Sequence, residues 1–317
     1  VDAGAEDVLA EEAVLAGLGD GDLEAVDGEG ILRADVDVAL GRADSDARNH
    51  LLPLTATRPM GELRVGILTL REKWERYLKG SASYITQEYL QEKYPIHIDD
   101  ENVIVNAGVL PNEQLCKRIS ELGISEALLL DGELVAARLN EVQFEQLIED
   151  EEVHSLQGID LDGSIPVVQI NHLWQLTLLG KQAIADDFAL LTSGRKSQPV
   201  SATNRIVGPV HNVFLEEGAV MECCTLNVTA GPVYIGKNAE LMEGAMLRGP
   251  VSVGADAIVR LGAKIYGPTT IGPGCRVGGE VTRSIMMANS NKAHDGFLGF
   301  VELFLAERNG HAQDLGA

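Results

Sequence analysis

A six-residue repeat in the second half of the chain is the feature that most constrains its fold. From Ile235 onward an aliphatic residue returns at every sixth position, and a small or β-branched residue follows each one four positions later. This period matches neither a helix nor a simple strand alternation. The aliphatic series is Ile235, Leu241, Leu247, Val253, Val259, Ile265, Ile271 and Val277, and the second series is Ala239, Ala245, Val251, Ala257, Ala263, Thr269, Cys275 and Val281.

The repeat predicts a triangular parallel β-solenoid in which each hexad forms one flat face. The aliphatic residue points to the core, the small residue packs near a corner, and frequent glycines tolerate the tight turns. At about 18 residues per coil, the run makes nearly three coils. Less regular coils are expected upstream, at Val207, Val213 and Ala219, with a break in register between Thr225 and Val233.

The region before the repeat predicts an α/β domain. Residues 103–106 and 126–130 are typical of strands, and residues 113–122 between them are typical of a helix, which indicates a parallel sheet. A second helix and strand are expected around residues 144–148 and 167–170. Residues 171–191 have helical spacing, with Asn171 as the expected N-cap, and residues 193–201 are expected to form a hinge between the domains.

Acidic residues are concentrated at the start of the chain. The whole sequence has 48 acidic and 25 basic residues, and residues 1–46 hold 14 of the acidic ones against only Arg33 and Arg42. This composition buries little apolar surface, so we expect residues 1–46 to be a disordered or non-native extension, with a functional acidic tail as the alternative. The net charge of −23 argues against a nucleic-acid partner.

The cysteines and the hydropathy pattern indicate a cytoplasmic protein. Cys116, Cys223, Cys224 and Cys275 form no CxxC pair, so we interpret them as buried free thiols and expect neither a disulfide framework nor a zinc knuckle. The sequence contains no apolar run of the roughly 18 residues that cross a bilayer, and no basic-then-apolar leader.

Several segments carry a resemblance to a known enzyme family. They are Leu51-Leu52-Pro53-Leu54-Thr55-Ala56-Thr57-Arg58-Pro59, Arg64-Val65-Gly66-Ile67-Leu68-Thr69, Glu72-Lys73-Trp74, Gly194-Arg195-Lys196-Ser197 and the hexads. Together they resemble the bifunctional UDP-N-acetylglucosamine pyrophosphorylase and glucosamine-1-phosphate N-acetyltransferase family, and more closely a divergent bacterial branch of sugar nucleotidyltransferases. The resemblance implies a left-handed parallel β-helix after a nucleotidyltransferase-like α/β domain, a homotrimer, and a role in cell-wall precursor synthesis.

The first activity that the resemblance implies is uridylyl transfer from UTP to N-acetylglucosamine 1-phosphate with Mg²⁺. Such a site needs backbone amides and cations around the phosphates. Arg48-Asn49-His50 stands where the family has Gly-Thr-Arg, and Met60 stands where it has a lysine. The substrate-binding candidates that remain are Arg58, Arg64 and Lys73.

The metal ligands that the resemblance implies are not evident in the sequence. Gly108 occupies the place of a family carboxylate in Asn106-Ala107-Gly108. Asp131 is the alternative at a strand end, although Asp131-Gly132 is more typical of a turn. We therefore name no metal-binding residue.

The second implied activity is acetyl transfer from acetyl-coenzyme A to glucosamine 1-phosphate. Histidine suits the role of general base because its ordinary pKa is near neutral. Lys292-Ala293-His294 resembles a Lys-Ala-Gly-His segment of the family, which implies His294 as the base, with Arg283 and Lys292 as substrate-binding residues. Phe297 stands in the place of a family tyrosine.

The ends of the chain depart from the family pattern. Residues 300–317 are helical in pattern and contain no hexad, so we expect the solenoid to end early, as in a truncated or frame-altered gene. A non-catalytic trimerisation scaffold or a sugar-nucleotide-binding module is the alternative function. A zinc-dependent carbonic anhydrase is not supported, because residues 207–282 contain only His211.

The expected organisation has four parts. Residues 1–46 are the acidic extension, 47–200 the α/β domain with its connecting helix, 201–299 the hexapeptide β-helix, and 300–317 a tail without repeats. The sequence leaves the sugar and the nucleotide undetermined.

Overall fold

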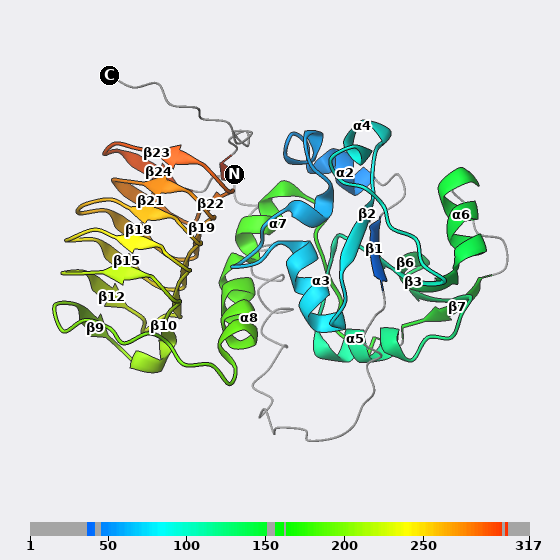
Figure 1. Cartoon of the computed structure of the whole chain (residues 1–317), viewed down its shortest axis with the longest axis horizontal. Coiled ribbons are helices and arrows are strands. Elements are labelled where there is room, and N and C mark those ends of the chain that lie inside the picture. Colours follow the sequence, from blue (N-terminus) through cyan, green and yellow to red (C-terminus); the bar gives the residue numbers. More distant parts are fainter. Residues whose placement is uncertain (1–36, 42–45, 151–155, 162, 300–301, 304–317) are drawn as a thin grey trace, which may run out of the picture.

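The computed structural model describes residues 37–41, 46–150, 156–161, 163–299 and 302–303. Within them an α/β domain is followed by a β-solenoid, with helix α8 between the two (Figure 1). The helices are α2 (Asp46–His50), α3 (Leu70–Leu78), α4 (Glu88–Gln91), α5 (Glu113–Ser120), α6 (Glu141–Asp150), α7 (Leu173–Leu178) and α8 (Gly180–Thr192), with 3-10 turns at Leu54–Ala56, Met60–Glu62 and Val210–Asn212. No helix among these residues is long and apolar enough to span a membrane.

The described strands of the first domain form a mixed sheet in the order β2-β1-β3-β6-β5-β7. Strands β1, β2 and β3 are parallel, whereas β6 is antiparallel to both of its neighbours. A short antiparallel pair, β4 and β8, lies beside this sheet. The strands are β1 (Asp37–Gly41), β2 (Ala82–Ile85), β3 (Glu101–Asn106), β4 (Val109–Leu110), β5 (Glu126–Leu130), β6 (Glu133–Asn140), β7 (Gln157–Asp160) and β8 (Val168–Gln169).

The predicted strands and the intervening helix are present, but the prediction of a purely parallel sheet was wrong. Strand β6 lies between β3 and β5, so these two parallel strands are not neighbours. Asp131 and Gly132, both with positive φ, form the tight turn from β5 to β6. The interpretation of Asp131 as a turn residue is therefore confirmed.

Strand β1 corrects the expected boundary at residue 46. Its backbone pairs with β2 on one side and β3 on the other, inside the acidic stretch that we expected to lie outside the fold. The alternating sequence Asp35-Val36-Asp37-Val38 was hidden by a composition averaged over 46 residues. Residues 1–36 lie outside the described part of the chain.

The connecting helix is also divided. Helix α7 begins after His172 rather than Asn171, and α8 follows α7 directly at Gly180. The Gln175 side chain accepts hydrogen bonds from the backbone N–H groups of Asn171 and His172 (2.6 and 2.9 Å). The predicted hinge at residues 193–201 is bonded to the first coil, since the Gln198 N–H donates to the Leu215 carbonyl (2.9 Å).

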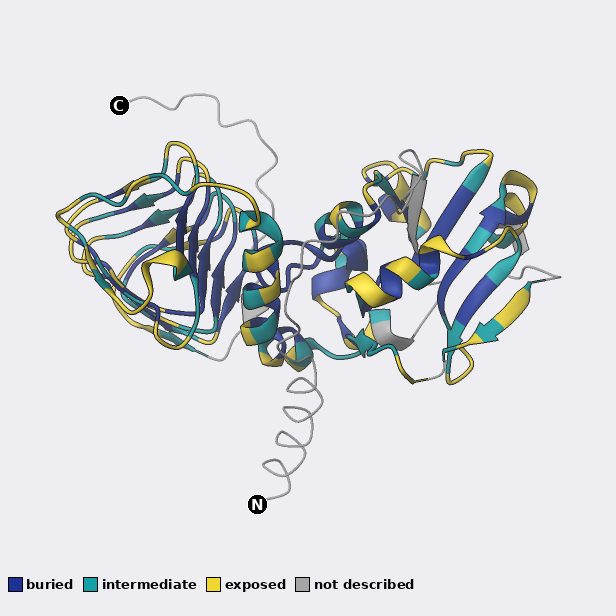
Figure 2. Ribbon diagram, turned by 90° about the horizontal axis from the view of Figure 1, so that it is seen from below, coloured by how far each residue is buried: buried dark blue, intermediate teal, exposed yellow. Residues whose placement is uncertain are grey.

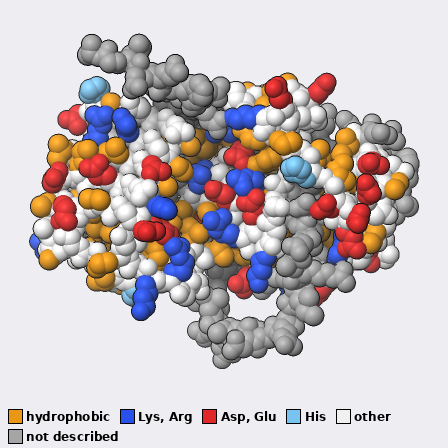
Figure 3. Space-filling model, in the orientation of Figure 1, with side chains coloured by type: hydrophobic (Ala, Val, Ile, Leu, Met, Phe, Trp, Pro, Cys, Tyr) orange, Lys and Arg blue, Asp and Glu red, His pale blue; other side chains and the backbone are white. Residues whose placement is uncertain are grey.

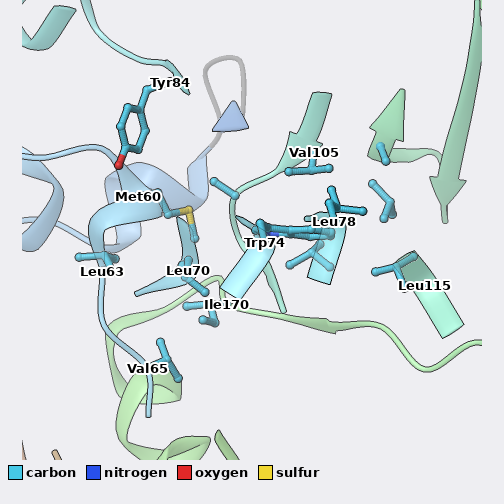
Figure 4. Close-up of a cluster of buried hydrophobic side chains, with 14 of the residues drawn as sticks. Met60, Leu63, Val65, Leu70, Trp74, Leu78, Tyr84, Val105, Leu115 and Ile170 are labelled. Atoms are coloured by element: carbon cyan, nitrogen blue, oxygen red, sulfur yellow. The ribbon is translucent and has the colours of Figure 1, made fainter. Parts of the chain in front are cut away.

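The core of the first domain surrounds Trp74, which is completely buried (Figure 4). Met60, Leu70 and Ile170 lie around it, although they come from distant parts of the sequence. Ile285 and Met287 of the solenoid belong to the same cluster. The two domains therefore share a core at the end of the solenoid.

The solenoid has three parallel sheets, as the hexads predicted. In the described residues their orders are β10-β13-β16-β19-β22-β25, β11-β14-β17-β20-β23 and β24-β21-β18-β15-β12-β9. The strands are β9 (Arg205–Val207), β10 (Val213–Leu215), β11 (Val220–Met221), β12 (Thr225–Asn227), β13 (Val233–Ile235), β14 (Glu240–Leu241), β15 (Met246–Arg248), β16 (Val251–Val253), β17 (Ile258–Val259), β18 (Lys264–Tyr266), β19 (Thr269–Ile271), β20 (Arg276–Val277), β21 (Glu280–Thr282), β22 (Ile285–Met286), β23 (Asn291–Lys292), β24 (Phe297–Gly299) and β25 (Glu302–Leu303).

Both predicted hexad series are buried throughout. The expected break in register is confirmed as well, because Leu226 pairs with Leu247, 21 residues on, whereas Leu247 pairs with Ile265, 18 residues on. The prediction for Val207 was wrong: Ile206 packs on the core and Val207 is exposed, since five residues join β9 to β10 whereas only two join β15 to β16.

The end of the repeat also differs from the prediction. Strand β25 pairs in parallel with β22, so the solenoid continues past residue 299. Glu302 and Leu303 are therefore in a strand and not in the predicted helical tail. Residues 304–317 lie outside the described part of the chain.

The cysteines are free, and three of the four are buried. Burial raises the pKa of the Cys116 thiol to about 12 and that of Cys224 to about 11. Cys223 is exposed at a corner of the solenoid, so the expectation of burial was wrong for this residue.

One face of the solenoid is covered and the other two are largely open. Strands β10, β13, β16 and β19 are buried on both sides because α8 and the first domain pack against their outer surface (Figure 2). Ile184 of α8 contacts a cluster that contains Phe214, Tyr234 and Ile67. Helix α8 is thus the main spacer between the domains.

Candidate functional site

The topology of the first sheet makes the region outside the carboxyl ends of β1 and β3 the candidate ligand site, and we call this region the crevice. The two strands are parallel neighbours, but the chain after β1 leads to α2 and α3, whereas the chain after β3 leads to β4 and α5. Ligands of open α/β sheets bind at such points, where the connections diverge. The segment after β1 leads through residues 46–62, and the segment after β3 begins at Ala107.

Met60 and Gly108 meet at this crevice. A Cβ atom added to Gly108 would lie 2.9 Å from Met60 Cε, 3.2 Å from the Ile170 carbonyl oxygen and 3.3 Å from Asn106 Oδ1. These are the two positions at which the resemblance implies a lysine and a carboxylate. Met60 therefore has a neutral thioether where the family has a charged lysine, and Gly108 has no side chain where the family has a carboxylate. The Met60 side chain fills the space next to Gly108.

The residues at the crevice do not fit the Mg²⁺ that the resemblance implies. Gly108 has no ligand atom in its side chain, and a larger residue there would collide with Met60. The Asn106 side chain accepts from the Gly108 N–H (2.9 Å) and donates to the Leu134 carbonyl (3.1 Å). Nowhere in the described residues do three His, Cys, Asp or Glu side chains come together as a metal site.

Arg48, from the segment in place of the family's Gly-Thr-Arg, holds its own loop. Its Nη2 atom donates to the Thr55 carbonyl (2.8 Å) and lies 2.7 Å from the Tyr89 hydroxyl, which in turn donates to the Ala56 carbonyl (2.9 Å). The buried Nε atom of Arg48 has no hydrogen-bond partner.

Arg64 and Lys73 are not at the crevice surface. Arg64 is 9% exposed and donates to the Ile67 carbonyl, with Glu72 Oε2 at 3.4 Å. Burial tends to raise the pKa of Glu72, but the charge of Arg64 and the Thr69 N–H outweigh it and lower that pKa overall. Lys73 is 4% exposed and forms an ion pair with Asp187 of α8.

Asp187 ties this segment to α8 with its second oxygen as well. Oδ2 accepts from the backbone N–H groups of Ile67 (2.7 Å) and Leu68 (3.0 Å). Arg64 and Lys73 are therefore buried and already paired within the protein where the domains meet, which does not favour the predicted role of these two cations in phosphate binding.

Gly66 completes this contact, which we call the junction and define as Arg64, Gly66, Lys73, Asp187 and Thr270. Gly66 has a φ of +83°, and a Cβ atom there would lie 2.6 Å from both the Ala183 carbonyl oxygen and Asp187 Oδ2. The Thr270 hydroxyl of β19 donates to the Gly66 carbonyl (2.8 Å). Only glycine fits this position.

Arg58 remains available at the crevice. It is half-exposed and precedes Pro59-Met60, and no hydrogen bond or ion pair joins it to another residue in the described ranges. Near the junction, basic and acidic side chains are interspersed on the face shown in Figure 3, with no broad patch of one sign. Arg58 therefore differs from Arg64 and Lys73, because it is neither buried nor paired with another described residue.

A stack of three rings was not foreseen from the sequence. The His50 and His172 rings lie 4.8 Å apart, and the His172 and Trp174 rings lie 4.2 Å apart with an angle of 10° between their planes. His50 is the last residue of α2, in the segment after β1, whereas His172 and Trp174 follow β8. The separation of over 120 residues gives no local signal for such a contact.

Residues 43–196 match the model of a family described as sugar nucleotidyl transferase. The first domain is sugar nucleotidyltransferase-like. The match spans the crevice segments and ends before β9, so the solenoid lies outside it. A search of curated proteins found no match to the chain.

The solenoid carries the remaining predicted site residues, away from the face that contacts the nucleotidyltransferase-like domain. His294 is exposed in the corner between β23 and β24. Lys292 Nζ donates to the carbonyls of Gly278 (2.6 Å) and His294 (3.0 Å), so its ammonium group anchors this corner. Arg283 is exposed at a different corner, between β21 and β22, with a φ of +43°.

The corner beneath His294 is unusually short. Two residues, Gly278 and Gly279, join β20 to β21, whereas four residues join β17 to β18. The backbone of the His294 loop rests on this short corner, since the Glu280 N–H donates to the Gly296 carbonyl (3.0 Å). A Cβ atom at Gly279 would lie 2.8 Å from Lys292 Nζ.

A shallow cavity of about 360 Å³ lies elsewhere, beside α5. Gln114, Lys117 and Ser164 are among its lining residues. It contains none of the predicted site residues, so we do not connect it with the candidate site.

Proposed function

We propose that the chain is a transferase of amino-sugar activation that acts on sugar 1-phosphates in the cytoplasm. The two reactions are acetyl transfer to glucosamine 1-phosphate and uridylyl transfer to N-acetylglucosamine 1-phosphate, in a homotrimer that supplies UDP-N-acetylglucosamine. The observation that carries the proposal is the family match over residues 43–196, in a chain that continues into a hexapeptide solenoid.

In the proposed acetyl transfer, the sugar amine attacks the acetyl carbonyl, the C–S bond of the thioester breaks, and coenzyme A leaves as its thiolate. His294 accepts the proton that the amine loses. The exposed position of His294 on an anchored corner supports this role. Lys292 fixes the backbone of that corner, and Arg283 is proposed to contact the sugar phosphate from another corner. Acetyl-coenzyme A supplies the acetyl thioester; we assign none of the described residues to it.

In the proposed uridylyl transfer, Arg58 contacts the phosphates of the nucleotide at the crevice. A guanidinium group suits phosphate because it combines charge with several donors. The Met60–Gly108 contact does not provide for a metal, and we therefore derive no step that passes through Mg²⁺.

The same contact favours a second candidate, a sugar-nucleotide-binding module without uridylyl transfer. With a methionine and a glycine in place of a lysine and a carboxylate, the crevice retains surface for binding but not the charges that stabilise a transferring phosphoryl group.

Two assays distinguish these candidates. Purified protein is given glucosamine 1-phosphate with acetyl-coenzyme A, and separately N-acetylglucosamine 1-phosphate with UTP and Mg²⁺. Turnover in both supports the transferase, and loss of acetyl transfer in a folded His294→Ala variant supports the base. Binding of UDP-N-acetylglucosamine with no turnover in either assay selects the module, whereas the absence of both binding and turnover would reject both candidates. The mass of the particle in solution tests the trimer.

A further inference from the structure

We propose that Trp174, backed by the stacked imidazoles of His172 and His50, is the surface on which the nucleobase of the sugar nucleotide stacks. This inference rests on the proposed function and adds a ligand contact to the crevice. The three rings form a continuous stack, with spacings of 4.2 and 4.8 Å and angles of 10° and 26° between successive planes.

The stack is open at the tryptophan. Trp174 remains 57% exposed even though His172 covers one face of its indole ring. The other tryptophan of the chain, Trp74, is completely buried. An indole face exposed to water is a favourable platform for a further planar ring, because base–aromatic stacking removes two flat apolar surfaces from water.

The stack also links the chain segments that follow β1 and β3. The Ile170 N–H, two residues before His172, donates to the Gly108 carbonyl (2.7 Å), which connects the Trp174 segment with the end of β3. His50 belongs to the segment after β1, which continues to Arg58 and Met60. The stack therefore connects the segment after β1, which contains Arg58, with the segment that is hydrogen-bonded to the end of β3.

Hydrogen bonds fix the backbone that carries the His172 and Trp174 rings. The Gln175 side chain binds the N–H groups of Asn171 and His172, so it fixes the backbone that presents the second ring. A planar base can cover the indole face across its whole ring, whereas a puckered sugar contacts such a face only through its C–H groups. The base is therefore the part of the ligand that we assign to Trp174.

Fluorescence titration tests the proposal, because the two tryptophans differ so strongly in exposure. The wild-type chain is titrated with UDP-N-acetylglucosamine, UMP, ribose 5-phosphate and N-acetylglucosamine 1-phosphate, with calorimetry as the independent measure of Kd. UDP-N-acetylglucosamine and UMP are expected to quench the emission and to shield Trp174 from iodide, whereas ribose 5-phosphate leaves both unchanged. Trp174→Ala is expected to weaken binding of UMP about tenfold, and Trp174→Phe to keep it within about threefold of wild type.

The outcomes separate this proposal from the proposed function. Equal UMP affinity in wild type and Trp174→Ala would overturn the base platform and leave the proposed function standing. Dependence of N-acetylglucosamine 1-phosphate, but not UMP, on Trp174 would also overturn it, because the ring would then pack against the sugar. No binding of any nucleotide by folded wild-type chain would overturn both. Unchanged circular dichroism of Trp174→Ala serves as the folding control, and because Trp174 is exposed, its replacement leaves the buried core intact.

Discussion

Charged residues of the junction are buried and paired, whereas Trp174 and His294 of the candidate site are exposed to solvent. At the junction, Lys73 and Asp187 are almost completely buried, and both carboxylate oxygens of Asp187 have partners at least 114 residues away in the sequence. Outside the junction, Trp174 in helix α7 and His294 in a corner of the solenoid are exposed. The difference shows that a charged residue in a specific motif can serve the contact between domains, and that burial and partners decide its role.

The largest expected effect comes from removing the buried cation of the junction. Lys73→Met leaves Asp187 as an unpaired buried charge and is expected to lower the free energy of unfolding by about 3–5 kcal/mol. Lys117→Met, at an exposed position of α5, is the matched control and should change it by less than about 0.5 kcal/mol. Urea unfolding measures both. Equal stabilities of the two variants would show that the junction does not depend on the ion pair.

A somewhat smaller effect is expected from Gly66. Gly66→Ala adds both a strained positive φ and a collision with α8, and is expected to cost about 3 kcal/mol. Gly132→Ala is a sharp control because Gly132 has nearly the same φ, +82°, with nothing within 4 Å of the added Cβ atom. It should cost about 1 kcal/mol, from the backbone alone. If both variants lowered the free energy of unfolding equally, the close contact of Gly66 with α8 would not contribute to the effect.

The smallest effect on global stability is expected from Lys292→Met in the His294 loop, where the change is local. Lys292→Met removes two hydrogen bonds to backbone carbonyls and is expected to speed hydrogen exchange of the Glu280 amide about tenfold. Exchange in the core strands should stay unchanged. Lys264→Met, at an exposed position of β18, is the control. Unchanged exchange at Glu280 would mean that Lys292 does not anchor the loop.

Sequence periodicity predicted the solenoid far better than it predicted the first domain. Each hexad forms its own contact with equivalent residues one coil away, so the pattern that is visible in the sequence is also the pattern of packing. The first sheet depends on long-range pairing: β6 inserts between β3 and β5, and β1 lies in a stretch whose overall composition is acidic. Neither arrangement leaves a local periodic signal.

The candidate site was predicted only in part, for a similar reason. Motif residues identified the right segments, but they could not show that Lys73 faces Asp187, 114 residues later. The stack of His50, His172 and Trp174 likewise exists only after folding. Residue type indicated the available chemistry, whereas the partner that each residue meets was set by the tertiary fold.

Two arginine variants test most directly whether the crevice, and not the junction, binds the ligand. The quantity to measure is their affinity for UDP-N-acetylglucosamine. Arg58→Gln removes the half-exposed cation beside the crevice, and Arg64→Gln removes the buried one. Calorimetry at a temperature where both variants are folded is predicted to give about tenfold weaker binding for Arg58→Gln and unchanged Kd for Arg64→Gln. Weaker binding by Arg64→Gln alongside wild-type affinity for Arg58→Gln would contradict the account.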